Sequence, residues 1–84
     1  MITIWKTALH PDCQIKMPVD AQILSVGKQG DDLCMWYLVD TDGQDEYRRF
    51  IVYGTGHDID ERGLEYIDTV MMEEFLVFHV FEKV

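Results

Sequence analysis

Apolar and polar residues alternate with a period of two through most of this chain. In residues 13–17, for example, Cys13, Ile15 and Met17 alternate with a glutamine and a lysine. A two-residue period places successive side chains on opposite faces of an extended strand. No twelve-residue window keeps apolar residues at the i, i+3, i+4 and i+7 spacing of an amphipathic helix. The sequence therefore predicts a fold built from strands, without a long helix.

Turn-forming residues divide this alternation into short segments. We predict strands at residues 2–9, 13–17, 21–28, 33–40, 46–54, 64–71 and 75–82. Gly30 and the pair Asp42-Gly43 are typical of hairpin turns, so each is expected to join two paired strands. Six to seven short strands at this spacing predict an all-β fold, namely a small antiparallel sandwich, roll or barrel. The apolar run Phe75–Phe78 places the last strand at the centre of a sheet, covered on both faces.

Size and charge restrict the partners of the chain. Its 84 residues are expected to form one domain over 1–84, and 48% of them are hydrophobic. The net charge is −9, so direct binding to nucleic acid or to an anionic membrane is not expected. No apolar run approaches the roughly 20 residues of a membrane span, and we expect a cytoplasmic protein. A core of this size is marginal, and its strand edges need cover, which favours a homo-oligomer.

The segment Gly54-Thr55-Gly56-His57 has the clearest potential to bind a ligand. Its two glycines allow a positive φ and a close approach of the backbone to a ligand. Consecutive amides in such a turn can form an anion-binding nest, to which His57 could add a donor. A turn that only ends a strand would need the same glycines. Neither a Lys-Ser/Thr pair nor a helix follows, so the segment is not a phosphate-binding loop or a dinucleotide fingerprint.

Three further side chains could complete such a site. Arg48 and Arg49 point to opposite faces of a strand, and either could bind a phosphate or carboxylate through two hydrogen bonds. Alternatively, each could pair with nearby surface carboxylates. Trp36 could stack on a base, or it could belong to the core. The candidate ligand-binding residues are therefore Gly54, Thr55, Gly56, His57, Arg48, Arg49 and Trp36.

No set of residues marks an enzyme or a metal site. His10 and Cys13 are separated by two residues, as zinc ligands can be, and Cys34 and His57 are available elsewhere, but the sequence has no CxxC or HxxxH motif to complete a four-ligand site. We therefore expect no metal and no cofactor, and we expect both cysteines to be reduced. His79 lies in an apolar strand and is expected to be a core or interface residue, since a catalytic role would need a nucleophile nearby.

Segments spread along most of the chain carry a resemblance to a known family. They are Ile23-Leu24-Ser25-Val26, Trp36 with Leu38-Val39-Asp40, Gly54-Thr55-Gly56-His57 and Leu76–Glu82. In this order they resemble a family of short proteins encoded by bacteriophages and prophages, a domain of unknown function. Asp58 stands where the relatives tend to have proline. The resemblance implies a phage accessory protein that is expressed in the cytoplasm of a bacterial host.

Two hypotheses about function follow, because small phage accessory proteins often resemble inhibitors of host defence. In the first, a non-enzymatic counter-defence protein binds and sequesters a nucleotide-like host immune signal. In the second, an acidic protein mimics DNA and inhibits a host nucleic-acid-binding defence protein. Carboxylates on one face of a strand repeat every ~6.6–6.8 Å, a regular spacing that could oppose a basic groove. An enzyme is not expected under either hypothesis.

Overall fold

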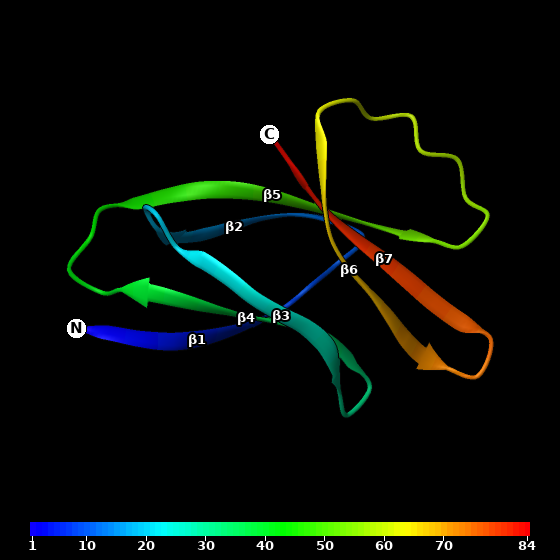
Figure 1. Cartoon of the computed structure of the whole chain (residues 1–84), viewed down its shortest axis with the longest axis horizontal. Coiled ribbons are helices and arrows are strands. Elements are labelled where there is room, and N and C mark those ends of the chain that lie inside the picture. The colour runs from blue at the N-terminus through cyan, green and yellow to red at the C-terminus, as the bar shows by residue number, and fades with distance from the viewer.

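Seven antiparallel strands form two sheets that lie face to face (Figure 1). The computed structural model describes all 84 residues. The strands are β1 (Ile2–Ala8), β2 (Asp12–Pro18), β3 (Gln22–Gln29), β4 (Asp32–Asp40), β5 (Asp45–Gly54), β6 (Leu64–Glu73) and β7 (Leu76–Lys83). The order is β1-β4-β3 in one sheet and β2-β5-β7-β6 in the other. The predicted all-β architecture is confirmed as a sandwich without a closed barrel, and each predicted strand ends within two residues of the observed one.

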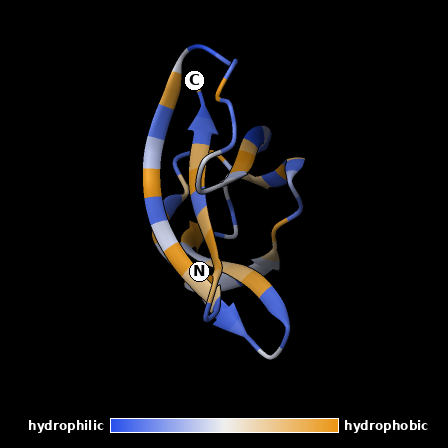
Figure 2. Ribbon diagram, turned by 90° about the vertical axis from the view of Figure 1, so that its right-hand side faces the viewer, coloured by the Kyte–Doolittle hydropathy of each residue, from blue (hydrophilic) through white to orange (hydrophobic).

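The period-two alternation of the sequence becomes the two faces of each sheet. Figure 2 shows hydrophilic and hydrophobic residues alternating along the ribbons. In the middle strand β4, every second residue from Leu33 to Val39 is buried between the sheets. Their neighbours, such as Trp36 and Leu38, therefore lie on the outer face of the three-stranded sheet. None of the elements is a helix that could cross a membrane.

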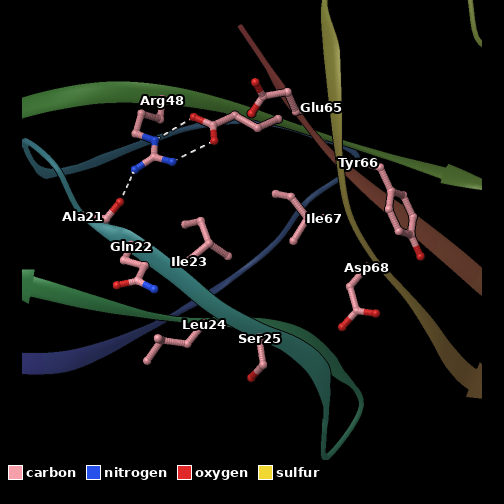
Figure 3. Close-up of a pocket in the computed structure, with 11 residues that line it drawn as sticks. Ala21, Gln22, Ile23, Leu24, Ser25, Arg48, Glu65, Tyr66, Ile67 and Asp68 are labelled. Carbon is pink, nitrogen blue, oxygen red and sulfur yellow. Dashed lines mark hydrogen bonds and ion pairs between the residues drawn. The ribbon is translucent and has the colours of Figure 1, made fainter.

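The sheets separate along one side, where β3 and β6 face each other as edge strands. No hydrogen-bonded ladder joins them, and a groove of about 430 Å³ lies between them (Figure 3). Each strand carries a β-bulge in this groove, at residues 23–25 of β3 and at residues 66–68 of β6. A bulge bends its strand and increases the local twist. The two bulged edges therefore diverge instead of pairing.

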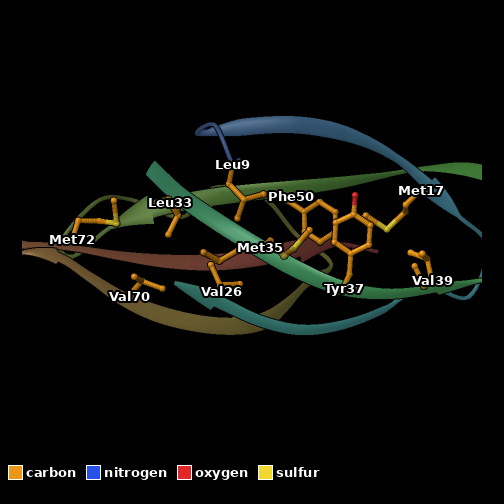
Figure 4. Packing of buried hydrophobic residues seen from close by; sticks show 12 residues of the cluster. Leu9, Met17, Val26, Leu33, Met35, Tyr37, Val39, Phe50, Val70 and Met72 are labelled. Carbon is orange, nitrogen blue, oxygen red and sulfur yellow. The ribbon is translucent and has the colours of Figure 1, made fainter. Parts of the chain in front are cut away.

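A single layer of apolar side chains fills the space between the sheets (Figure 4). Phe50 of β5, Val80 of β7 and Met17 of β2 are fully buried in it from the four-stranded sheet. Met35 and Tyr37 of β4 meet them from the three-stranded sheet. This layer is the source of most of the stability of the fold, because burial of apolar area is the main favourable term.

Two of the predicted turns have different outcomes. Gly30 has a φ of +60° in the turn between Gln29 and Asp32, and it forms the predicted hairpin of β3 and β4. The prediction of a hairpin at Asp42-Gly43 is wrong, because β4 and β5 belong to different sheets. β4 already pairs with β1 and β3, so the chain after it crosses to the other sheet and pairs with β2.

The connection between β5 and β6 is a crossover. Because β7 is antiparallel to both of its neighbours, β5 and β6 run in the same direction. Residues 55–63 must therefore return along the sheet from the end of β5 to the start of β6 (Figure 1). They form no helix. The Gly54–His57 segment lies at the beginning of this crossover, at the end of β5.

The last strand is central in its sheet, as predicted, but it is not covered on both faces. β7 lies between β5 and β6. Only Val80 of this strand is fully buried. Phe75 falls in the turn before the strand and is 92% exposed. The expectation of two covered faces is wrong because a two-layer sandwich leaves the outer face of each sheet open.

Replacement of Phe50 tests which face of β5 packs into the core. Phe50→Ala should lower the free energy of unfolding by about 3–5 kcal/mol, because it leaves a cavity in the apolar layer. Tyr47 on the same strand is 67% exposed, so Tyr47→Ala should cost only about 0.5 kcal/mol. Urea denaturation of both variants measures the two losses. Equal losses would contradict the orientation of β5.

Candidate functional site

The Gly54-Thr55-Gly56-His57 segment forms a tight turn at the end of β5. The amide of His57 donates to the carbonyl oxygen of Gly54 at 3.1 Å, which closes a four-residue turn. Gly56 has a φ of +87°, as the third residue of a type II turn requires. A β-branched side chain at this position would be strained. The turn therefore depends on Gly56 for its backbone shape.

The imidazole ring of His57 packs directly over Gly54. A Cβ atom on Gly54 would lie 2.8 Å from Cε1 of His57, closer than such atoms approach each other. The amide of Gly54 also donates to Nδ1 of His57 at 3.3 Å. A neutral ring that accepts at Nδ1 carries its hydrogen on Nε2. Gly54 therefore sets the place and the tautomer of His57, and Nε2 has no partner within the chain.

The amides of the turn are mostly used within the protein. The amide of Gly54 binds the His57 ring, and the amide of Thr55 donates to the carbonyl oxygen of Val77 at 3.4 Å. The amide of His57 closes the turn. Gly56 alone retains a free amide. The turn thus presents one backbone donor to a ligand, where a nest would present several consecutive ones.

Gly54 and His57 line a pocket of about 380 Å³ at one end of the sandwich, which we call the end pocket. Its floor is apolar and is made chiefly by Leu9, Leu33, Val52, Met72 and Phe78. Four polar side chains stand at its rim, namely His10, Asp31, Asp32 and His57. An apolar concavity with a few polar groups is the usual form of a small-molecule site.

A second hollow of about 450 Å³ lies on the other side of the turn. It shares Gly54, His57 and Phe78 with the end pocket and is also lined by Thr55 and by residues 74–77. Phe75, the most exposed large apolar side chain, belongs to this hollow. The His57 ring therefore stands between two concave surfaces.

A hydrogen-bonded chain behind the turn was not foreseen from the sequence. Oγ1 of Thr55 lies 2.7 Å from Nε2 of His79, and Oγ1 of Thr69 lies 2.9 Å from Nδ1 of the same ring. The hydroxyl of Tyr66 lies 2.7 Å from Thr69 Oγ1. Both ring nitrogens are therefore satisfied, and His79 ties the turn to β6. Alternation predicted the strand of His79, but the contact with Thr55 depends on the crossover.

Arg48 connects the two sheets. Its Nε and Nη2 donate to the two carboxylate oxygens of Glu82 at 2.6 and 2.7 Å, and Nη1 donates to the carbonyl oxygen of Ala21 at 2.6 Å (Figure 3). The guanidinium carbon also lies 5.9 Å from the centroid of the Phe50 ring. The hydrogen bond with Glu82 raises the pKa of Arg48 above its ordinary value. All three nitrogens of Arg48 are engaged inside the protein.

Arg49 is likewise occupied by carboxylates, on the outer face of the sheet. Its Nε and Nη2 donate to the carboxylate of Asp12 at 2.9 and 2.7 Å, and Nη2 also donates to Glu61 at 3.0 Å. The hydrogen bond from Arg49 lowers the pKa of Asp12. Arg48 precedes Gly54 by six positions on a strand that rises ~3.3 Å per residue, so about 20 Å separates them. The structure thus places neither arginine at the turn.

Trp36 also lies away from the turn. It is half-buried on the outer face of the three-stranded sheet, opposite Lys6 of β1. The aromatic rings that do gather are on the four-stranded sheet, where Phe81 lies 5.8 Å from Tyr53 and 5.7 Å from Tyr66 between ring centroids. No group of three or more histidine, cysteine or acidic side chains is placed to hold a metal, and Cys13 and Cys34 are free.

Removal of the Arg48 side chain should reveal its structural role. Arg48→Met leaves Glu82 without its partner in a largely buried setting, so the free energy of unfolding should fall by about 3 kcal/mol. Lys16→Met breaks the 3.8 Å contact with Asp45, in which both side chains are about half exposed. That loss should stay below about 1 kcal/mol. Urea denaturation measures the free energy of unfolding of both variants. Similar losses of stability would contradict the role of Arg48 in connecting the two sheets.

Comparison with known proteins identifies the family of the chain. No curated protein and no solved structure matches it. A family described as a domain of unknown function (DUF7352) matches residues 1–84. The chain therefore belongs to the DUF7352 family.

Proposed function

We propose that this protein is a non-enzymatic binding protein that holds and sequesters a nucleotide-like signal in the end pocket. The resemblance of its sequence segments to phage proteins supports a counter-defence role within a bacterial host cell. The observation that carries the proposal is the convergence of Gly54 and His57 on an apolar pocket with a polar rim. Part of the glycine-rich turn, Gly54 and His57, thus lines a concave surface.

The dimensions and walls of the end pocket suit part of a nucleotide. Its volume of about 380 Å³ falls within the roughly 300–1,000 Å³ range of ligand pockets. Phe78 supplies an aromatic wall, and stacking of a base on an aromatic ring tolerates different bases. The remainder of a larger ligand could extend past His57 into the second hollow.

Binding without turnover agrees with the chemistry around the turn. A nucleophilic enzyme would need a hydroxyl group in contact with a base. At the turn, the hydroxyl of Thr55 contacts the His79 ring, but Thr55 does not line the end pocket. The other ring nitrogen of His79 contacts Thr69, a neutral hydroxyl, instead of the carboxylate that orients the base in a catalytic triad. These features support a binding role.

The Gly54→Ala variant tests this proposal. The added Cβ would displace the His57 ring, so affinity should fall by about tenfold, the equivalent of roughly 1.4 kcal/mol. Gly27→Ala is the matched control, because its Cβ would meet only Trp36 at an ordinary 3.7 Å. Calorimetric titration with cyclic and linear nucleotides measures both variants and the unaltered protein. Failure of every nucleotide to bind the unaltered protein would refute the proposal.

The acidic-inhibitor hypothesis keeps one specific observation in its favour. Of the 16 carboxylate side chains, six form ion pairs, which leaves ten outside any ion pair. Unpaired carboxylates on an exposed surface could oppose the basic groove of a nucleic-acid-binding protein.

Competition with DNA would test this second candidate. The protein should displace duplex DNA from a basic, histone-like bacterial DNA-binding protein at low salt, and the effect should disappear as salt screens the charges. Gly54→Ala should leave this competition unchanged, because the substitution alters no charge. Fluorescence anisotropy of labelled DNA measures the displacement. Absence of displacement at low salt would exclude this class of target.

A further inference from the structure

The basic side chains are distributed unusually for a protein that binds a nucleotide-like ligand. None of the seven lysines and arginines lines the end pocket or the second hollow. Four of them, Lys16, Arg48, Arg49 and Lys83, are held in ion pairs with carboxylates. Phosphate sites normally use arginine, lysine or several backbone amides. Here the turn offers one free amide, that of Gly56.

The rim of the end pocket carries negative charge instead. Asp31 and Asp32 lie in and beside the turn between β3 and β4, are both exposed, and form no ion pair. The protein as a whole carries a net charge of −9. A phosphate at this rim would therefore be repelled both by the adjacent carboxylates and by the field of the whole molecule.

The same groups are well suited to the edge of an amino-substituted base. The carboxylates of Asp31 and Asp32 can accept hydrogen bonds from an exocyclic amino group. His57 accepts at Nδ1 from Gly54, so its Nε2–H is available to donate to a ring nitrogen. Adenine, cytosine and guanine carry an exocyclic amino group, whereas uracil and thymine present only carbonyl oxygens and one ring N–H.

We propose that the end pocket recognises the uncharged, amino-bearing heteroaromatic ring of its ligand and leaves the phosphate outside in solvent. This inference rests on the proposed function and names the part of the ligand that the pocket reads. Val52, Met72 and Phe78 enclose the ring, and the rim carboxylates select its amino edge. In this arrangement the phosphate makes no favourable contact with the protein, and its charge is repelled by the negative charge of the protein.

Calorimetric titration with adenosine, adenosine monophosphate and uridine tests this inference on the unaltered protein. Adenosine should bind more tightly than its monophosphate at 50 mM salt, a salt level at which exposed charges interact over roughly 14 Å. Uridine should bind at least about tenfold more weakly than adenosine, because it lacks the exocyclic amino group that the rim carboxylates would accept from. The affinity for the monophosphate should rise with salt, whereas a phosphate-binding site would lose affinity.

Asp32→Asn separates the effect of the rim from the effect of net charge. It should narrow the difference in affinity between adenosine and its monophosphate, because one repelling carboxylate is gone. Asp20→Asn is the matched control, because it changes the net charge by the same amount. Asp20 lies in the turn between β2 and β3, beside the end of β4 that is far from the end pocket. Asparagine also tolerates the φ of +63° found at Asp20. Equal effects of the two variants would overturn a role for the rim.

The outcomes also distinguish this inference from the function on which it rests. If the monophosphate binds more tightly than adenosine, or if salt weakens its binding, recognition through the ring is wrong while nucleotide binding stands. If neither nucleosides nor nucleotides bind, the proposed function is wrong and this inference fails with it.

Discussion

The fold depends on one layer of apolar side chains between two sheets, and the end pocket is the place where that layer stops. Leu9, Leu33 and Met72 belong both to the core and to the floor of the pocket. They are largely buried, and the small part of each that stays exposed at this end supplies apolar surface to the site. Polar groups come from the turns and from the start of β4, which bring His57 and Asp32 to the rim. The stability of the fold and the proposed ligand binding therefore depend on the same residues.

Much of the architecture could be predicted because it follows from local pattern. Alternation located all seven strands, and Gly30 marked a true hairpin. The turn signal at Asp42-Gly43 correctly indicated a reversal, but a reversal does not determine whether the two strands pair. That outcome depended on β1 and β3, which already occupy both edges of β4. The outer face of β7 is open because the fold has only two sheets, and the number of sheets cannot be read from any short segment of the sequence.

The candidate site was only partly predictable, for a related physical reason. A glycine-rich turn could be recognised at residues 54–57, but the use of its amides depends on Val77, a residue far along the chain. Alternation correctly placed Arg48 and Arg49 on opposite faces, but it could not reveal Glu82, Asp12 or their geometry. Such partners are set by strand order, and strand order emerges from the packing of the whole chain. The residue types therefore indicated which side chains could form hydrogen bonds, whereas the strand order determined which partners they contact.

The paired bulges on β3 and β6 have a consequence for contact between molecules. A straight, unpaired strand offers a continuous row of backbone donors and acceptors to any extended chain, and this is how edge-to-edge aggregation begins. In this protein the row is interrupted at residues 23–25 and again at residues 66–68. A second copy could not continue either sheet in register past these points. The β3 and β6 edges are thus protected by irregular geometry, and two copies that pair edge to edge would have to do so through β1 or β2, the other edge strands of the two sheets.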